Sequence, residues 1–384
     1  MKTKHWTDIK FSKDILTDAL TKHILGLTQY GMADFAEVME VISQVKKGDE
    51  ESWINTWSSM AQKLKSRAEL AEKKSQKVTA STAYLRASTY FRVATMYFGK
   101  IDDPRMKNCT IESHNCYEKY LGLSEYPGKY VEIPYENTYL PGHYYHSPIA
   151  KEKAPLLIIT PGRDTWAEDT RWVYDGAIKR GINCLIYDGP GQGFALRLGG
   201  LPFRPDWENV MKPVVDFALT LPGVDRNRIG LMGLSFGGFL IPRAVAFEKR
   251  IKLCIVDPGN INWGGAIAER LQVIKRTPKI FRPSFMNFML QDYAWKQGVS
   301  EDEVIEELKK YDNTSILDKI TCRMLVMDGT KEPMFGEAKK FYDALKCPKD
   351  YMLFDEDTTA QAHCQMGSYA TGTEYLFDWI SDNL

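Results

Sequence analysis

Hydrophobic positions in the first third of the chain recur at steps of three and four residues, which is the period of an α-helix. This spacing predicts helices over residues 32–47, 50–74 and 79–98. Trp53 and Trp57 of the second helix fall on one apolar stripe. Residues 1 to about 125 are therefore expected to be helical, and residues 1–127 to form an N-terminal all-helical domain.

The pattern changes after residue 128, where short apolar runs alternate with helical stretches. The predicted strands cover residues 130–135 and 140–145, which form a hairpin, and then 156–160, 183–188, 229–234, 252–256, 323–328 and 351–354. Strands that alternate with helices indicate an α/β fold with a mostly parallel sheet covered on both faces. Residues 128–384 are therefore predicted to form one α/β domain. The alternation stops over about residues 259–320, which predicts a helical lid insertion, with extra helical packing as the alternative.

One predicted strand ends in Gly233-Leu-Ser-Phe-Gly237, which fits the pattern G-x-S-x-G and is followed by an apolar helix. A strand, a sharp turn and a helix are the context of a nucleophile elbow. The glycines leave room for a strained turn that exposes the serine hydroxyl. Ser235 is therefore the predicted nucleophile, and a chance match in a loop is the alternative.

A serine nucleophile needs a base beside it and an acid that orients the base. Of the six histidines, only His363 follows the final predicted strand, where an α/β-hydrolase places its base. For the acid, Glu332 is favoured because it lies in a turn, whereas Asp328 ends a strand and would be held by strand pairing. A weaker third choice is the group Asp355, Glu356 and Asp357.

Two backbone amides are expected to stabilise the oxyanion that forms on the attacked carbonyl. One is the amide of Phe236, directly after the serine, and the other is the amide of Arg163, in the loop after strand 156–160. The Arg163 side chain could contact a polar or anionic substrate group or form a surface salt bridge. The turn Gly189-Pro-Gly-Gln-Gly193 lacks the lysine and the spacing of a phosphate-binding loop and is interpreted as a tight turn.

Composition excludes several classes of partner. The 384 residues are 44% hydrophobic and 26% charged with a net charge of zero, so no field attracts nucleic acid or an anionic membrane. The sequence shows neither a secretory signal nor an apolar run of membrane-spanning length. The seven cysteines form no C-x-x-C motif, which indicates a reducing, cytoplasmic location without disulfides. The histidines do not cluster with cysteines, so no metal is expected.

The C-terminal two thirds, with these motifs, resemble an α/β-hydrolase. Ser52–Trp57 and Thr79–Arg92 are similar to the N-terminal region of a subgroup with a helical domain ahead of the hydrolase core, and the turn at 188–193 fits that subgroup too. It includes the fermentation-respiration-switch protein-like esterases, 2,6-dihydroxypseudooxynicotine hydrolase and the yellowish-green-type polyketide chain-shortening hydrolases. The resemblance implies cleavage of an ester, or of a carbon–carbon bond beside a ketone, in a small molecule. It also implies a pocket between the helical domain and the core, no cofactor, and often a homodimer.

The resemblance further implies an extra acidic residue near the serine in some members, for which Asp257 and Glu269 are possible positions. The acid of the triad is usually an aspartate in this family, so the glutamate at position 332 is a departure. Asp328 therefore remains a candidate for the acid. Two alternatives to a Ser-His-Glu/Asp hydrolase remain open. One is an aminopeptidase or acylaminoacyl-peptidase of related fold, although these usually carry a β-propeller. The other is a non-catalytic binding protein that uses the same pocket.

Overall fold

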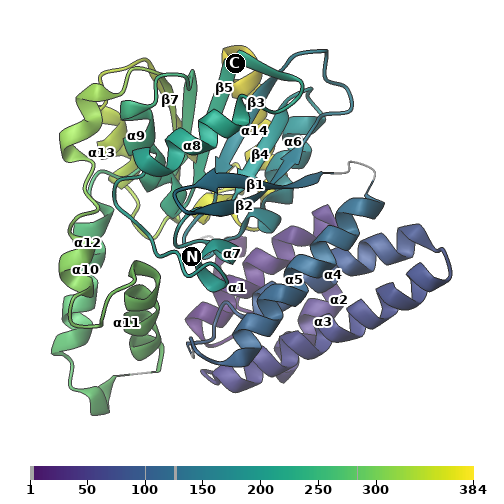
Figure 1. The fold of residues 1–384 in the computed structure, drawn as a ribbon. Helices are drawn as coiled ribbons and strands as arrows, with labels where there is room; N and C mark the ends of the chain where they lie inside the picture. Colours follow the sequence, from purple (N-terminus) through teal and green to yellow (C-terminus); the bar gives the residue numbers. More distant parts are fainter. Residues whose placement is uncertain (1–3, 100, 125–127, 283) are drawn as a thin grey trace. The chain divides into compact units, whose positions relative to one another are not determined.

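The chain folds into two compact units, shown in Figure 1 as a computed structural model that describes residues 4–99, 101–124, 128–282 and 284–384. The first unit comprises Met1–Lys129 and Met366–Ala370, and the second comprises Tyr130–Gln365 and Thr371–Leu384. The predicted boundary after residue 127 falls at residues 125–127, which lie outside the described residues.

The first unit is helical. It contains α1 (Ile15–Gly26), α2 (Phe35–Gln44), α3 (Glu50–Lys73), α4 (Lys77–Ala94) and α5 (Pro104–Leu123), with 3-10 turns at Trp6–Asp8 and Leu27–Tyr30. Aspartates that precede α1, α2 and α3 accept hydrogen bonds from amides of the first turn, which fixes where these helices begin. Trp53 and Trp57 are fully buried, and Trp53 Nε1 donates to the Val93 carbonyl oxygen at 2.8 Å. The predicted apolar stripe is therefore the core of this unit.

The second unit is built on an eight-stranded sheet with the order β1-β2-β4-β3-β5-β6-β7-β8. The strands are β1 (Lys129–Tyr135), β2 (Thr138–Tyr145), β3 (Ala154–Thr160), β4 (Asn183–Tyr187), β5 (Val224–Leu234), β6 (Leu253–Asp257), β7 (Arg323–Gly329) and β8 (Lys349–Phe354). β2 runs antiparallel to β4, and every pair from β4 to β8 is parallel. The mostly parallel sheet predicted from the sequence is confirmed.

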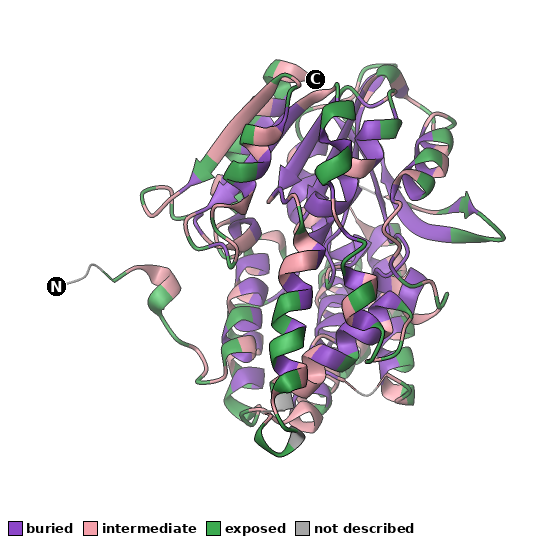
Figure 2. Ribbon diagram, turned by 90° about the vertical axis from the view of Figure 1, so that its left-hand side faces the viewer, coloured by how far each residue is buried: buried purple, intermediate pink, exposed green. Residues whose placement is uncertain are grey.

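Both faces of the central strands are buried, as Figure 2 shows by its purple strands between helices with exposed outer surfaces. On one face, Leu156 and Ile158 of β3 pack in a hydrophobic cluster with α8 (Glu208–Ala218) and α9 (Phe236–Phe247). The other face is covered by α6 (Arg171–Ile178) and α14 (Tyr369–Asn383). Burial on two sides explains why these strands are continuous apolar runs in the sequence.

The predicted helical insertion lies between β6 and β7. It contains α10 (Trp263–Arg276), α11 (Ser284–Gln297) and α12 (Val304–Leu308), with 3-10 turns at Lys279–Phe281 and Thr314–Lys319. Leu271, Leu290 and Leu308 lie at the centre of a hydrophobic cluster that these three helices share. The insertion is therefore a packed layer of helices with its own core.

The described part of this unit also contains 3-10 turns at Ala167–Thr170 and His363–Gln365, α7 (Gly193–Arg197) and α13 (Glu337–Ala344). Of these, α7 was not predicted, because the glycine-rich sequence before it was interpreted only as a turn. In the described part of the chain, none of the helices combines the length and the apolar character that crossing a lipid bilayer requires.

Candidate active site

Ser235 lies on the sharp turn between β5 and α9. Its backbone has φ +53° and ψ −118°, a conformation that a residue with a side chain rarely adopts. The neighbouring glycines are required by space. A Cβ atom on Gly233 would lie 2.4 Å from the Gly237 carbonyl oxygen, and one on Gly237 would lie 2.4 Å from the Thr160 carbonyl oxygen. The sequence G-x-S-x-G therefore forms an elbow that raises the serine above the end of the sheet.

The structure brings the three residues predicted as nucleophile, base and acid into one chain of hydrogen bonds. His363, in the loop after β8, places Nε2 2.8 Å from Ser235 Oγ. Its Nδ1 lies 2.6 Å from Glu332 Oε2, in the turn after β7. The other oxygen of Glu332 accepts a hydrogen bond from the Cys364 amide at 3.3 Å, so this buried carboxylate is held at both oxygens.

The competing acids are engaged elsewhere. Asp328 Oδ2 accepts from the Tyr351 hydroxyl at 2.8 Å, and its Oδ1 accepts from the Gly329 amide at 2.9 Å. Asp355 accepts from amides of its own turn, and Glu356 pairs with Lys331 at 3.4 Å. Among the carboxylates weighed from the sequence, the geometry therefore favours Glu332 as the partner of His363.

Charges around the imidazole favour its protonated form. Burial by itself would lower the pKa of His363, but the neighbouring Cys364 sulfur and the Glu332 carboxylate outweigh burial and raise this pKa well above its usual value. Burial also raises the pKa of Cys364 to about 12, so this thiol is neutral near pH 7. The Glu332 carboxylate is therefore the charge that stabilises the imidazolium at neutral pH.

Asp257 is a second carboxyl group beneath the site, at the end of β6. It is fully buried, and burial followed by the nearby charge of Glu332 raises its pKa to about 7. Its Oδ1 accepts from Gln365 Nε2 at 3.1 Å, and its Oδ2 has no hydrogen-bond partner. Of the two positions considered for an extra acid, Asp257 is buried close to the predicted triad, whereas Glu269 is exposed on α10.

The loop that carries the predicted second oxyanion donor lies against the serine. A Cβ atom on Gly162 would lie 2.9 Å from the Ser235 Cβ, so the backbone of residues 162 and 163 passes directly beside the nucleophile. The amide of Phe236 is the first of α9, where helical amides have no partner within the helix. Both predicted donors therefore belong to segments that border Ser235.

A glutamine that the sequence analysis overlooked holds this loop in place. Gln192 is fully buried in the turn after β4. Its Nε2 donates to the carbonyl oxygens of Pro161 and Gly162, at 2.5 and 3.1 Å, and its Oε1 accepts from the Gly189 amide at 2.8 Å. The glycine-rich sequence is thus a turn, as interpreted, but its glutamine also supports the loop that carries the predicted oxyanion donor.

The side chain of Arg163 forms a salt bridge, which is one of the two interpretations considered from the sequence, but this salt bridge belongs to a buried ion cluster and does not lie on the surface. Its Nη1 lies 2.5 Å from Asp292 Oδ2 of α11, and its guanidinium stacks 3.7 Å from the Tyr293 ring centroid. Lys296, also buried, pairs with Asp292 at 3.0 Å and with Asp164. The cluster fastens the inserted helix α11 to the loop that contains the predicted oxyanion donor.

A cavity of about 170 Å³ opens beside Ser235 and His363. Its wall is mostly apolar and includes Phe236, Phe239, Trp263 and Ile267, with the polar side chains of Asn260 and Arg270. Trp263, Ile267 and Arg270 come from α10, so the insertion forms one side of the cavity. Within the described ranges, no three side chains of histidine, cysteine, aspartate or glutamate gather in a way that could hold a metal ion.

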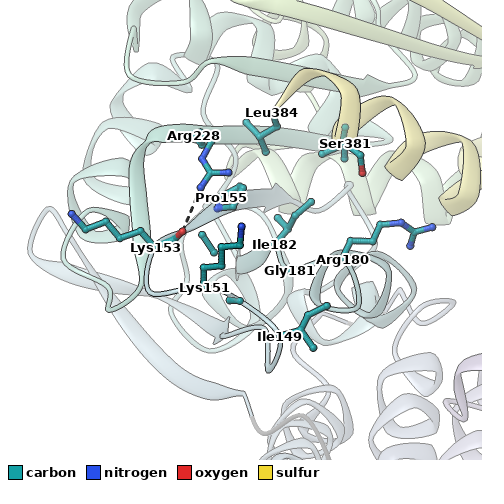
Figure 3. Close-up of a pocket in the computed structure, with 13 residues that line it drawn as sticks. Ile149, Lys151, Lys153, Pro155, Arg180, Gly181, Ile182, Arg228, Ser381 and Leu384 are labelled. Atoms are coloured by element: carbon teal, nitrogen blue, oxygen red, sulfur yellow. Dashed lines mark hydrogen bonds between the residues drawn. The ribbon is translucent and has the colours of Figure 1, made fainter.

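A separate cavity of about 370 Å³ lies at the amino ends of β3 and β4 (Figure 3). Lys153, Arg180 and Arg228 line it, and none of its described lining residues has an imidazole or carboxylate side chain. Because Ser235 and His363 follow the carboxyl ends of strands, this cavity lies at the other edge of the sheet and takes no part in the site.

Strand order, the serine elbow and the turns that bring an acid and a histidine to it define the protein as an α/β-hydrolase. The comparisons with known proteins agree. A family described as esterase FrsA-like matches residues 36–277, so the chain belongs to the FrsA-like esterase family.

Individual relatives are similar over most of their length. The hydrolase LUC6 of a Fusarium species is 34% identical over an alignment of 400 positions, which covers 94% of each chain. The hydrolase acrC of Aspergillus aculeatus is 35% identical over an alignment of 358 positions, which covers 83% of this chain and 81% of its own. The solved structure of 2,6-dihydroxy-pseudo-oxynicotine hydrolase has a TM-score of 0.76 over 95% of both chains, with 18% identity. At that identity the likeness concerns the fold.

Proposed function

We propose that the protein is a serine hydrolase that cleaves an ester, or a carbon–carbon bond beside a ketone, in a small molecule. The observation that carries the proposal is the chain of hydrogen bonds from Ser235 Oγ through His363 to Glu332, at 2.8 and 2.6 Å. Glu332 accepts from Nδ1 and so leaves the unprotonated Nε2 facing the serine hydroxyl. The imidazole is thereby oriented to act as a general base.

In the proposed reaction, Ser235 Oγ bonds to the substrate carbonyl carbon while its proton moves to His363 Nε2. The electron pair of the carbonyl moves onto oxygen, and the amides of Phe236 and Arg163 stabilise the resulting oxyanion. When the oxyanion collapses, the bond to the leaving group breaks, and the departing alkoxide or carbanion takes the proton from His363. Water then attacks the acyl-enzyme by the same steps and frees Ser235.

We propose that the insertion between β6 and β7 acts as a lid over Ser235. Trp263 and Ile267 of α10 line the cavity at Ser235, and Asp292 of α11 pairs with Arg163 of the oxyanion loop. A wall of this kind excludes water from the oxyanion and strengthens its hydrogen bonds. The apolar lining supports a substrate with an apolar body.

The test compares the parent protein with Ser235→Ala, and with Ser59→Ala on the exposed surface of α3 as a matched control. A fluorophosphonate probe is expected to label the parent and the control but not Ser235→Ala. The parent and the control are also expected to hydrolyse members of a panel of p-nitrophenyl esters and β-diketones, whereas Ser235→Ala is expected to hydrolyse none. Equal rates in the parent and Ser235→Ala would contradict the serine mechanism, and a parent that is neither labelled nor active would instead support a non-catalytic binding protein.

A further inference from the structure

Asn260 is a buried polar side chain in the wall of the cavity at Ser235 and takes no part in the hydrogen bonds that join Ser235, His363 and Glu332. It follows β6 and is only 6% exposed. Its Oδ1 has no hydrogen-bond partner, and its Nδ2 makes only a 4.0 Å contact with the Met334 sulfur. A buried amide is normally hydrogen-bonded at both ends, so this one has unused hydrogen-bonding capacity in the wall beside the nucleophile.

The loop that carries Asn260 is packed from behind. A Cβ atom on Gly259 would lie 2.6 Å from Phe341 Cδ1, and Phe341 is itself fully buried in the core of the sheet. Asn260 therefore cannot easily withdraw from the cavity to find another partner within the protein. A few fixed polar groups on a mostly apolar wall are the usual means by which a pocket orients its ligand.

Arg270 supplies a positive charge to the same cavity from α10. Its side chain is exposed, and among the described residues no carboxylate lies within ion-pair distance of it. Glu337, which also lines the cavity, is paired with Lys340 at 2.7 Å. An unpaired guanidinium is suited to bind a carboxylate or another acidic group of a ligand.

We infer that Asn260 and Arg270 form a substrate-recognition subsite. Asn260 binds a hydroxyl or keto oxygen of the substrate, and Arg270 binds an acidic group at the mouth of the cavity. The inference rests on the proposed function, because it takes the cavity at Ser235 as the reaction site. It defines the substrate class as an apolar carbonyl compound that carries a second, uncharged oxygen and an acidic substituent.

The test uses three matched p-nitrophenyl esters: butyrate, 3-hydroxybutyrate and the glutarate monoester. The variants are Asn260→Leu and Arg270→Met, with Asn227→Leu in the exposed part of β5 and Arg276→Met at the end of α10 as matched controls. The parent is expected to show at least tenfold higher kcat/KM for 3-hydroxybutyrate and for the glutarate monoester than for butyrate. Asn260→Leu should abolish the first preference and Arg270→Met the second, whereas the two surface controls should keep both preferences.

Fluorophosphonate labelling of Ser235 separates the two possible failures. If the parent is labelled but has no preference among the esters, or hydrolyses none of them, the subsite is contradicted and the nucleophile stands. If both variants keep the preferences of the parent, the subsite is contradicted as well. If the parent is not labelled, both the proposed function and the subsite are contradicted.

Discussion

Gln192 donates its side-chain amide to the carbonyl oxygen of Pro161 across 2.5 Å, and this bond joins the turn after β4 to the loop after β3. The same amide reaches the Gly162 carbonyl oxygen, one residue before the predicted oxyanion donor. In the proposed reaction, Gln192 is therefore a positioning residue: it touches no reacting atom, but it fixes the loop that carries the backbone amide proposed to bind the oxyanion.

Replacing this glutamine should impair the chemical step more than substrate binding. Gln192→Leu keeps the size of the side chain but leaves two buried carbonyl oxygens without their donor, and we expect kcat to fall about 10- to 100-fold with KM little changed. Steady-state kinetics on an ester substrate measure both constants. Gln44→Leu on the exposed surface of α2 is the control, and a Gln192→Leu variant whose KM rises while kcat holds would contradict the positioning role.

The identity of the triad acid can be decided by exchanging each candidate for its amide. Glu332→Gln should lower kcat by about 10⁴-fold, because the imidazole loses the partner that fixes its tautomer. Asp328→Asn should change kcat only a few-fold, since Asp328 bonds to Tyr351 and the Gly329 amide. The opposite order of losses would assign the acid to Asp328.

The pH profile gives a second, independent measure of the same pair. The Glu332 carboxylate raises the pKa of His363, and the imidazole must be unprotonated to act as a base. Removing the charge of Glu332 lowers that pKa, so the low-pH limb of kcat/KM should move to lower pH in Glu332→Gln. The residual activity of this variant, measured from pH 4 to pH 9, tests the shift, and an unmoved limb would contradict it.

Asp257 should make stability depend on pH. Its pKa is about 7 in the folded protein, above the 3.8 of an ordinary aspartate, so the folded state holds this proton more tightly than the unfolded state. The carboxyl group therefore does not reduce the free energy of unfolding below pH 4, where it is protonated in both states. Between pH 4 and pH 7 it destabilises the folded state increasingly, because the unfolded state releases the proton first. Asp257→Asn keeps an acceptor for Gln365 and should be more stable than the parent by up to about 4 kcal/mol above pH 7, and equal to it near pH 4.

Urea unfolding at pH 4, 5.5 and 7.5 measures this difference, with Asp378→Asn on the exposed surface of α14 as the control. A gain in stability that is the same at every pH would show that Asp257 acts through packing and not through its proton.

The ion cluster around Arg163 should couple the insertion to the site. Asp292→Asn leaves the buried charges of Arg163 and Lys296 undercompensated, which should cost about 3 kcal/mol of unfolding free energy and reduce kcat as well. The double variant Asp292→Asn with Lys296→Met removes one charge of each sign and should recover part of the stability. Urea unfolding measures the free energy of unfolding, and steady-state kinetics measure kcat. The exposed pair Glu306 and Lys309 is the control, and its removal should have no measurable effect.

Much of the site was predictable because it depends on local sequence. The elbow at Ser235 is a contiguous motif, and His363 is the histidine that follows the last strand. Glu332 was favoured over Asp328 by a general argument about turns and strand ends, and the hydrogen bonds of both residues agree with that argument.

What the sequence did not indicate depends on contacts between distant segments. Asp292 meets Arg163 across 129 positions, and nothing in either neighbourhood distinguishes a buried pair from a surface one. Gln192 was overlooked because the glycines around it are enough to predict a turn, and a turn requires no particular role for the glutamine. Asn260 has no motif at all, and its unsatisfied amide becomes visible only when the walls of the cavity are known.

The left-handed backbone at Ser235 has an evolutionary consequence. A glycine would adopt φ +53° without strain, so exchanging Ser235 for glycine removes the hydroxyl and relieves the strain of the turn at once. The proposed reactivity of Ser235 is therefore maintained against the conformational preference of the turn, and a single, energetically favourable substitution would abolish it. In lineages where the reaction is no longer under selection, we accordingly expect stable, inactive proteins that keep the whole fold.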